Sequence, residues 1–151
     1  MPAPLLSDSD GRLIQVFFDG GCFPNPGRKY GSFEVLAGDR TLVRRIRFDL
    51  GLGTNNEAEF EALEAALAAT IIFLRGTPVN VWDYWLVIFT DSMIVKNRMM
   101  GKNVIHKKKS WAGSSERMFN LAKRCLDLAD QFGSFRVEWR SREMNVARFG
   151  H

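Results

Sequence analysis

The sequence predicts an α/β fold: a five-stranded mixed sheet whose first three strands are antiparallel, with helices packed on both faces. Three observations lead to this fold class. Strand and helix patterns follow one another along the 151 residues in the order β-β-β-α-β-α-α-β. Only three residues, 38–40, join the second and third strand patterns, which is typical of an antiparallel hairpin. The segment 54–76 carries both the start and the stop signals of a long helix.

The first three strands are expected at residues 13–19, 31–37 and 41–50. The first, LIQVFFD, is rich in β-forming residues and lies between Gly11 and Gly20, which mark its ends. In the third, apolar and charged residues alternate, so one of its faces is expected to contact water.

The long helix begins after an N-cap, Thr54, and Glu57 three residues later completes a capping box. Gly76 and Pro78 end it. The patterns that follow predict a strand (84–91), a short helix (92 to about 100), a basic loop (101–110), an amphipathic helix (114–131) and a last strand (135–140).

Composition limits the class of protein. With 46% apolar residues the chain is long enough for a core, and a single domain is expected over residues 12–151, after a flexible tail at 1–11. No apolar run approaches the roughly 18 residues of a membrane span, and no signal-peptide pattern precedes the first strand. The two cysteines lack metal-ligand spacing, which favours a reduced, cytoplasmic protein.

Positive charge is concentrated in the second part of the chain. Residues 1–91 contain 8 Lys and Arg against 12 Asp and Glu, whereas residues 92–151 contain 13 against 5. Six of these basic residues lie between Ser92 and Ser115, with no acidic residue among them. Such a segment suits a polyanion such as nucleic acid, although a solvated surface loop can have the same composition.

One acidic residue of the long helix is out of place. Glu57, Glu61 and Glu64 follow helical steps of four and three and are expected to face solvent. Glu59 instead shares with Leu63 the apolar stripe that must pack on the sheet. A carboxylate at that position must be neutralised, hydrogen-bonded or bound to a cation.

Two more carboxylates, Asp19 and Asp91, are expected at the ends of the apolar strands 13–19 and 84–91. Each alone can be explained as a turn or cap residue. Together with Glu59 at the helix start they can converge on one point, where their mutual repulsion calls for a divalent cation. Ligation by oxygen alone, without His or Cys, favours Mg²⁺ or Mn²⁺ over Zn²⁺.

These segments resemble the motifs of type 1 ribonuclease H. FFDGGCFPNPG (17–27) resembles the first-strand motif of that family, TNNEAEFEAL (54–63) its helix motif, FTDS (89–92) its fourth-strand motif and REMN (142–145) the approach to its last helix. The order of the elements is similar as well, over about residues 12–151.

The resemblance implies a metal-dependent endonuclease that cleaves the RNA strand of RNA/DNA hybrids and leaves 5′-phosphate and 3′-hydroxyl ends. Asp19, Glu59 and Asp91 would be its catalytic metal ligands and would hold two Mg²⁺ ions, with Mn²⁺ as a substitute. One ion would activate the attacking water, and the other would stabilise the leaving 3′ oxygen. No small-molecule cofactor is implied, and a monomer is expected.

The resemblance also implies contacts to the substrate. Gly20 is expected to bind substrate, and the residues expected at sugars of the hybrid, including the 2′-hydroxyl, are Gly21, Asn25, Asn55, Asn56 and Ser92, with Thr54 at a phosphate. The glycines would let the RNA strand approach the backbone. Lys107, Lys108 and Lys109 would face the DNA strand without reading its sequence. A purely local role, in a turn and at the helix entry, is the alternative for the asparagines.

The family pattern breaks at its fourth carboxylate. The last helix of the family carries an Asp four residues after the Asn matched by Asn145, and Phe149 takes this place here. His151 is the remaining candidate, as a metal ligand or a proton carrier, although a terminal His without a catalytic role is the alternative. Three carboxylates can still hold metal, so we expect activity with a raised metal requirement or a preference for Mn²⁺.

Two other functions fit the same residues. A domain of this fold that binds hybrid or structured RNA with little catalysis would explain the missing Asp, but it has no need of three inward carboxylates. A nuclease of the same fold that acts on DNA is the other, and the TNNEAE, DGG and NPG motifs favour the hybrid enzyme over it.

Overall fold

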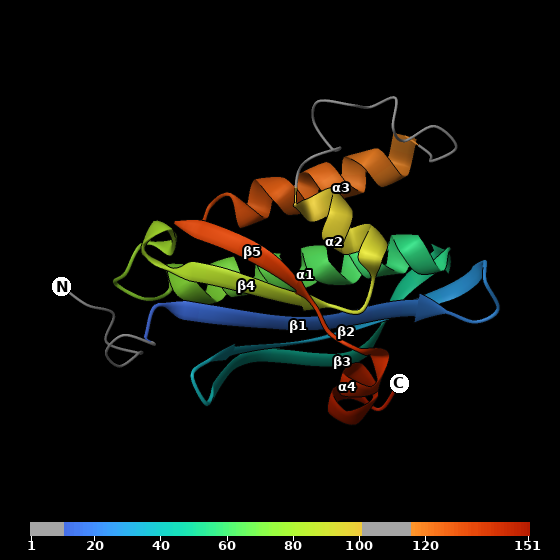
Figure 1. Ribbon diagram of the computed structural model, residues 1–151, viewed down its shortest axis with the longest axis horizontal. Helices are drawn as coiled ribbons and strands as arrows, with labels where there is room; N and C mark the ends of the chain where they lie inside the picture. The colour runs from blue at the N-terminus through green and yellow to red at the C-terminus, as the bar shows by residue number, and fades with distance from the viewer. Residues whose placement is uncertain (1–10, 101–115) are drawn as a thin grey trace.

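The computed structural model describes residues 11–100 and 116–151 (Figure 1). The first ten residues of the predicted tail and the basic segment with Lys107, Lys108 and Lys109 lie outside these ranges. The strands are β1 (Leu13–Cys22), β2 (Gly27–Ala37), β3 (Arg40–Gly53), β4 (Trp85–Thr90) and β5 (Ser134–Trp139), and the helices are α1 (Asn55–Arg75), α2 (Met93–Met99), α3 (Glu116–Ala129) and α4 (Arg142–Phe149), with a 3₁₀ turn, η1, at Val81–Asp83. None of the described helices has the length and apolar composition of a membrane span.

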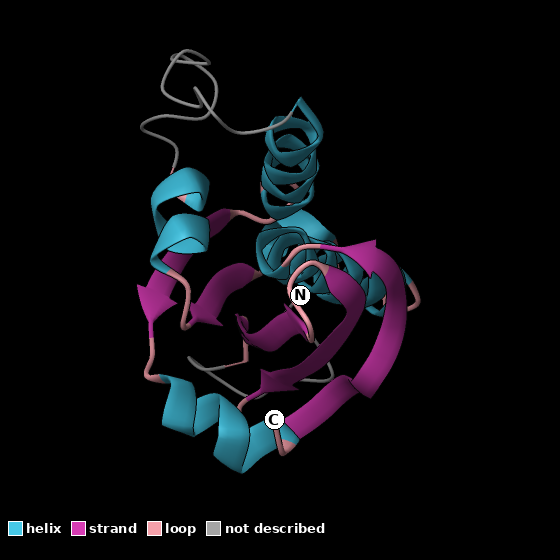
Figure 2. Ribbon diagram, turned by 90° about the vertical axis from the view of Figure 1, so that its right-hand side faces the viewer, coloured by secondary structure: helices cyan, strands magenta, loops and turns pink. Residues whose placement is uncertain are grey.

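The strands form one mixed sheet in the order β3-β2-β1-β4-β5. The β1–β2 and β2–β3 pairs are antiparallel, whereas β4 runs parallel to both β1 and β5. Helices α1 and α3 lie on one side of the sheet and α4 lies on the other (Figures 1 and 2). The predicted α/β class, the antiparallel first three strands and the helices on both faces are thus confirmed.

Helix α1 supplies the main apolar face of the core. Thr54 and Glu57 form the predicted capping box at its start. Phe60 and Leu63 are fully buried and belong to the same core cluster as Phe18 of β1. The stripe predicted to pack on the sheet does so, and it fixes the rotation of α1 about its axis.

Strand β1 continues beyond its predicted end. Asp19 lies inside the strand, because the two glycines after it pair with Gly31 and Tyr30 of β2. Glycine weakens a strand, but here the neighbouring strand of the hairpin supplies the pairing. The prediction that Asp19 ends its strand is therefore wrong, whereas Asp91 does follow the last residue of β4 directly.

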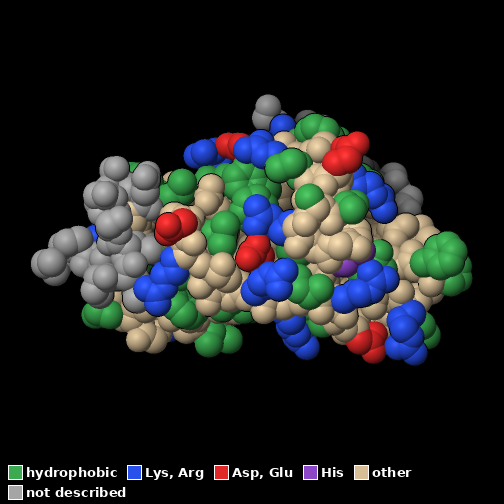
Figure 3. Space-filling view, turned by 90° about the horizontal axis from the view of Figure 1, so that it is seen from below, with side chains coloured by type: hydrophobic (Ala, Val, Ile, Leu, Met, Phe, Trp, Pro, Cys, Tyr) green, Lys and Arg blue, Asp and Glu red, His purple; other side chains and the backbone are tan. Residues whose placement is uncertain are grey.

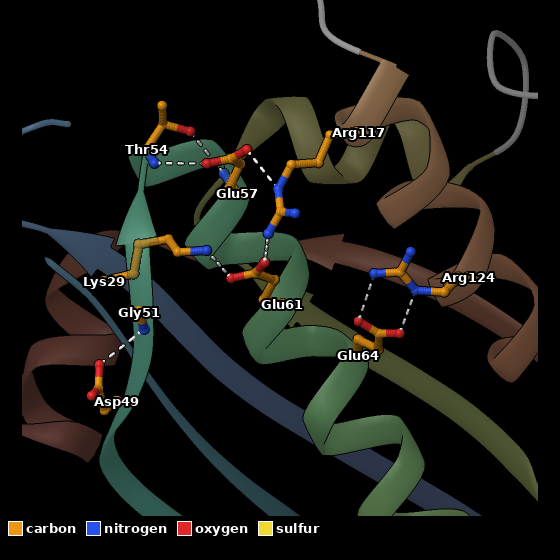
Figure 4. A network of polar contacts seen from close by, with 9 residues as sticks. All are labelled: Lys29, Asp49, Gly51, Thr54, Glu57, Glu61, Glu64, Arg117 and Arg124. Carbon is orange, nitrogen blue, oxygen red and sulfur yellow. Dashed lines mark hydrogen bonds and ion pairs between the residues drawn. The ribbon is translucent and has the colours of Figure 1, made fainter. Parts of the chain in front are cut away.

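The prediction that Glu57, Glu61 and Glu64 face solvent is also wrong. Helix α3 packs along this side of α1, and the three glutamates are only partly exposed. Arg117 bridges Glu57 and Glu61, at N–O distances of 2.9 and 2.7 Å, and Arg124 pairs with Glu64 at 2.7 Å (Figure 4). These arginines lie far along the chain, so helical periodicity alone could not reveal them.

Lys29 of β2 extends this network into the interior. Its side chain is 1% exposed, and its ammonium group pairs with Glu61 (Figure 4). Glu61 therefore joins β2, α1 and α3 through two cations. Because Glu57 accepts a hydrogen bond from the backbone N–H of Thr54 and also binds Arg117, the network fixes the first turns of α1 on the sheet.

We expect Lys29→Met to lower the free energy of unfolding by about 3 kcal/mol, because Glu61 would keep only one cation in a poorly solvated place. Urea or thermal unfolding measures this change. Lys123→Met is the matched control, since Lys123 pairs with Asp127 at 3.5 Å on the surface, where such a pair contributes less than about 1 kcal/mol. Equal losses in the two variants would show that the buried pair adds no stability.

Helix α4 is anchored to the sheet face opposite α1. Arg148 pairs with Glu34 of β2 at 2.5 Å, and its guanidinium lies 3.6 Å from the ring centre of Phe17. Phe149, at the place of the missing fourth carboxylate, is buried. This anchoring brings the end of the chain, with His151, against β1 and β2.

Candidate active site

Three carboxylates from three elements meet in one place. Asp19 comes from β1, Glu59 from the start of α1 and Asp91 from the turn after β4. One oxygen of each lies within 4.8 Å of the others. Because β1 and β4 are parallel neighbours, they present their acids at the same end of the sheet. The convergence expected from the sequence is present.

Gly20 explains how α1 comes close enough for Glu59 to join the site. A Cβ at Gly20 would lie 2.3 Å from the carbonyl oxygen of Ala58. The Gly20 amide donates a hydrogen bond to Glu59 Oε1 at 3.1 Å. A Cβ at Gly21 would lie 2.9 Å from the hydroxyl of Tyr30. At both glycines, neighbouring protein atoms thus occupy the place that a Cβ would take, which gives each glycine a packing role.

The three carboxylates line a cavity of about 390 Å³. Four of the residues predicted to bind substrate line it too: Gly20, Gly21, Asn55 and Ser92. The other three described candidates do not: Asn25, Thr54 and Asn56. The cavity thus gathers the metal candidates and part of the expected substrate contacts.

Asn25 and Asn55 tie the β1–β2 turn to the start of α1. Asn55 Oδ1 accepts a hydrogen bond from the Cys22 amide at 2.7 Å, and Asn25 Oδ1 accepts one from the Asn55 amide at 3.1 Å. The local role that was the alternative for these asparagines is therefore present. Their NH₂ groups donate to no residue in the described ranges, so these donors can serve a ligand.

Burial and mutual repulsion disfavour negative charge on the carboxylates. Asp19 is 8% exposed, and burial together with repulsion from Asp91 raises its pKa to about 7, against the opposing effects of Arg142 and the Gly20 amide. Burial, with repulsion from Asp19 and Asp91, raises the pKa of Glu59 well above its ordinary value. A hard divalent cation would compensate these charges, and the oxygen-only donor set fits one.

His151 lies beside Asp19. Its Nδ1 is 3.3 Å from Asp19 Oδ2, and its Nε2 is 2.5 Å from Ser32 Oγ. The contact with Asp19 lacks hydrogen-bond geometry, so the buried Nδ1 has no hydrogen bond to any described residue. Burial and the charges of Arg47 and Arg142 lower the pKa of His151, which favours the neutral imidazole.

Sequence reasoning missed four residues that line the cavity: Cys22, Phe23, Tyr30 and Arg142. Arg142 forms no ion pair with another described residue, and its charge lowers the pKa of Asp19. The available signal was its place in REMN, directly after the N-cap of α4. The Tyr30 ring packs edge-on against His151, with 4.8 Å between ring centres, and no sequence signal indicated this contact.

A family model and individual relatives both indicate that this chain is related to ribonuclease H. The family model described as RNase H matches residues 12–140. Ribonuclease HI of Halobacterium salinarum is 28% identical over 139 residues, covering 80% of this chain and 67% of the relative. Ribonuclease H of Dichelobacter nodosus is 30% identical over 150 residues, covering 93% of this chain and 80% of the relative.

Solved structures share the fold. The N-terminal RNase H domain of Rv2228c from Mycobacterium tuberculosis matches with a TM-score of 0.72 at 23% identity, covering 91% of this chain and 88% of that one. LC11-RNase H1, solved in complex with an RNA/DNA hybrid, matches with a TM-score of 0.67 at 23% identity and 91% coverage of each chain. The family model spans most of this chain, and the relatives that it matches are ribonucleases H. This chain therefore belongs to the type 1 ribonuclease H family.

Proposed function

We propose that this protein is an endonuclease that hydrolyses the RNA strand of RNA/DNA hybrids with divalent metal. The observation that carries this proposal is the meeting of Asp19, Glu59 and Asp91 within 4.8 Å, in a member of this family. The hybrid bound to LC11-RNase H1, which has the same fold, supports the choice of substrate. We further propose that the protein acts as a monomer in the cytoplasm.

The three carboxylates would hold two Mg²⁺ ions, or Mn²⁺ in their place. The bound ions would supply a nucleophile at neutral pH and stabilise negative charge at the scissile phosphate. The chain itself would orient the substrate. Arg142 provides a positive charge at the cavity, and the backbone of Gly21 and the NH₂ group of Asn55, which donates to no described residue, would contact sugars. Cleavage would leave 5′-phosphate and 3′-hydroxyl ends.

A cleavage assay tests this function directly. End-labelled RNA/DNA hybrid, duplex RNA, duplex DNA and single strands are incubated with Mg²⁺, Mn²⁺ or a chelator. We expect cleavage of the RNA strand of the hybrid alone, and only when metal is present. Binding of the hybrid without cleavage would instead support a binding domain, and cleavage of DNA would support a DNA nuclease.

We also propose that His151 provides a metal ligand in place of the missing fourth carboxylate. If Nε2 donates its proton to Ser32 Oγ, the lone pair of Nδ1 is directed to the side of Asp19. A histidine that binds metal commonly has its second ring nitrogen hydrogen-bonded in this way. The lowered pKa of His151 favours the neutral form that such a ligand requires.

His151→Ala should therefore raise the metal concentration needed for half-maximal cleavage by about tenfold or more, because one ligand is lost. Ser32→Ala leaves the imidazole in place but removes the partner of Nε2, together with the acceptor of the Arg47 amide, and should produce a smaller shift in the same direction. Rates measured over a series of Mg²⁺ and Mn²⁺ concentrations give both values. A metal dependence of His151→Ala equal to that of the wild type would exclude His151 as a ligand.

A further inference from the structure

A second recess, of about 460 Å³, adjoins the catalytic cavity. We call it the Arg47 recess; it is lined by Phe23, Arg28, Lys29, Tyr30, Arg47 and Asp49. Phe23 and Tyr30 line both hollows, so the two lie side by side. A nucleic-acid strand that occupies the cavity would reach the recess with its neighbouring nucleotides.

The backbone holds Arg47 in an unusual conformation. Its φ is 53°, a value that costs a residue other than glycine roughly 1 kcal/mol. Arg47 lies in a bulge of β3, because the register between β2 and β3 shifts from Gly31–Phe48 to Phe33–Arg45. Its amide donates a hydrogen bond to Ser32 Oγ at 2.8 Å, which secures the bulge. Bulges of this kind redirect a side chain.

The redirected side chain of Arg47 lies over an aromatic ring. Its guanidinium carbon is 4.5 Å from the centre of the Tyr30 ring, in cation–π geometry. The same ring packs edge-on against His151, which in turn lies beside Asp19. Arg47 is thus connected to the candidate metal ligand Asp19 through the side chains of Tyr30 and His151.

No described residue neutralises the charge of Arg47. It is exposed, and it forms no ion pair with any residue in ranges 11–100 and 116–151. Arg28 already pairs with Asp49 at 3.1 Å, and the ammonium group of Lys29 is directed to Glu61 instead. Figure 3 shows Lys and Arg side chains spread over the face seen from below, where they outnumber the Asp and Glu side chains that lie among them. Four other arginines differ from Arg47 because each pairs with Glu34 or Glu138: Arg44, Arg136, Arg140 and Arg148.

We propose that Arg47 binds a backbone phosphate of the RNA strand, next to the phosphate that is cut. This proposal rests on the proposed function and deepens it. A guanidinium group can bind two phosphate oxygens through parallel hydrogen bonds, and the Tyr30 ring keeps it oriented for this contact. A phosphate contact fixes the position of the strand without reading its bases. Arg47 therefore contributes to substrate affinity and register, while the chemical step belongs to the carboxylates.

The test compares binding of a short RNA/DNA hybrid, in chelator, over a series of salt concentrations. We expect Arg47→Gln to weaken binding about fivefold at low salt. It should also reduce the slope of log Kd against log salt by nearly one, the change that corresponds to one lost phosphate contact. Arg47→Lys should keep most of this slope, because the charge remains. Arg40→Gln is the matched control, since it removes the same charge from the opposite end of β3, and it should bind like the wild type.

Two further variants separate binding from folding. Arg47→Gly accepts the positive φ without strain, so it should fold as well as the wild type in thermal melting and yet bind as weakly as Arg47→Gln. Asp49→Asn removes the acid of the recess and should tighten binding about twofold, which is a change of opposite sign. With active enzyme and Mg²⁺, Arg47→Gln should raise KM and leave kcat unchanged.

Replacing one phosphate by a neutral methylphosphonate shows whether Arg47 contacts the RNA strand or the DNA strand. Placed in the RNA next to the cleavage site, it should weaken binding of the wild type and leave Arg47→Gln unaffected. The proposal is overturned if Arg47→Gln and Arg47→Gly bind like Arg40→Gln, or if only methylphosphonates in the DNA strand have this effect. The two hypotheses can be told apart. If the proposed function is wrong, the wild type does not cleave the hybrid; if only the role of Arg47 is wrong, the wild type still cleaves it.

Discussion

Asp19→Asn is expected to lower the rate of hybrid cleavage by at least about 10³-fold, because it removes one of the three carboxylates that hold metal. Single-turnover cleavage of labelled hybrid at saturating Mg²⁺ measures the loss. Asp39→Asn is the control, since it removes an acid from the exposed β2–β3 turn and should leave the rate unchanged. Cleavage by Asp19→Asn at the wild-type rate would show that Asp19 has no part in catalysis.

The same substitution should stabilise the metal-free protein. The pKa of Asp19 is about 7 in the folded protein, against its ordinary value of 3.8, so the folded state binds more protons between these pH values. Metal-free wild type therefore loses stability as pH rises from about 4 to about 7. Asn cannot ionise, so at pH 8 the variant should be more stable by roughly 2 kcal/mol, and the pH dependence that remains belongs to Glu59, whose pKa is also raised by burial.

Thermal melting in chelator, from acidic to alkaline pH, measures this stabilisation. With divalent metal, the wild type should instead be more stable than Asp19→Asn, because a ligand stabilises the protein that binds it more tightly. A metal-free wild type whose stability does not change across this pH range would show that Asp19 is not held in an unfavourable charge environment.

Gly20→Ala is the second change with a large expected effect. The new Cβ would lie 2.3 Å from the carbonyl oxygen of Ala58, which belongs to helix backbone and cannot turn aside. Helix α1 would have to move away from β1, at a cost of about 3 kcal/mol. Because Glu59 moves with the helix, cleavage should also fall by about 10²-fold under conditions where the variant is folded.

Gly38→Ala provides the matched comparison for Gly20→Ala. Gly38 has a φ of +64°, but no atom lies within 4 Å of its missing Cβ. Alanine there should lower stability by about 1 kcal/mol through backbone strain and leave the activity of folded protein unchanged. Unfolding curves and cleavage rates of both variants separate lost stability from a displaced Glu59. If Gly20→Ala retains full activity, close packing at Gly20 does not position Glu59.

The central part of the site could be predicted because its signals are local. Glu59 interrupts an apolar stripe that periodicity alone identifies, and Asp91 ends a strand recognisable by composition. The capping box at Thr54 defined where α1 begins, and therefore which turn carries Glu59. These features depend on residues within a few positions of one another.

The features that were missed depend on contacts between distant parts of the chain. Strand β1 passes through two glycines because β2 pairs with them, which no property of DGG indicates. Glu61 avoids solvent because Lys29 and Arg117 arrive from β2 and α3. The contact between His151 and Ser32, residues 119 positions apart, depends on how α4 packs across the sheet. Local patterns in a single sequence do not predict these contacts between distant residues.

The claim that underlies the proposed function is that Asp19, Glu59 and Asp91 hold divalent metal together. Anomalous scattering from crystals grown with Mn²⁺ tests it most directly. We predict anomalous density within ligand distance of all three carboxylates in the wild type, weakened or lost in Asp19→Asn. Saturating Mn²⁺ that leaves this cavity without density, or that binds only elsewhere on the protein, would contradict the claim.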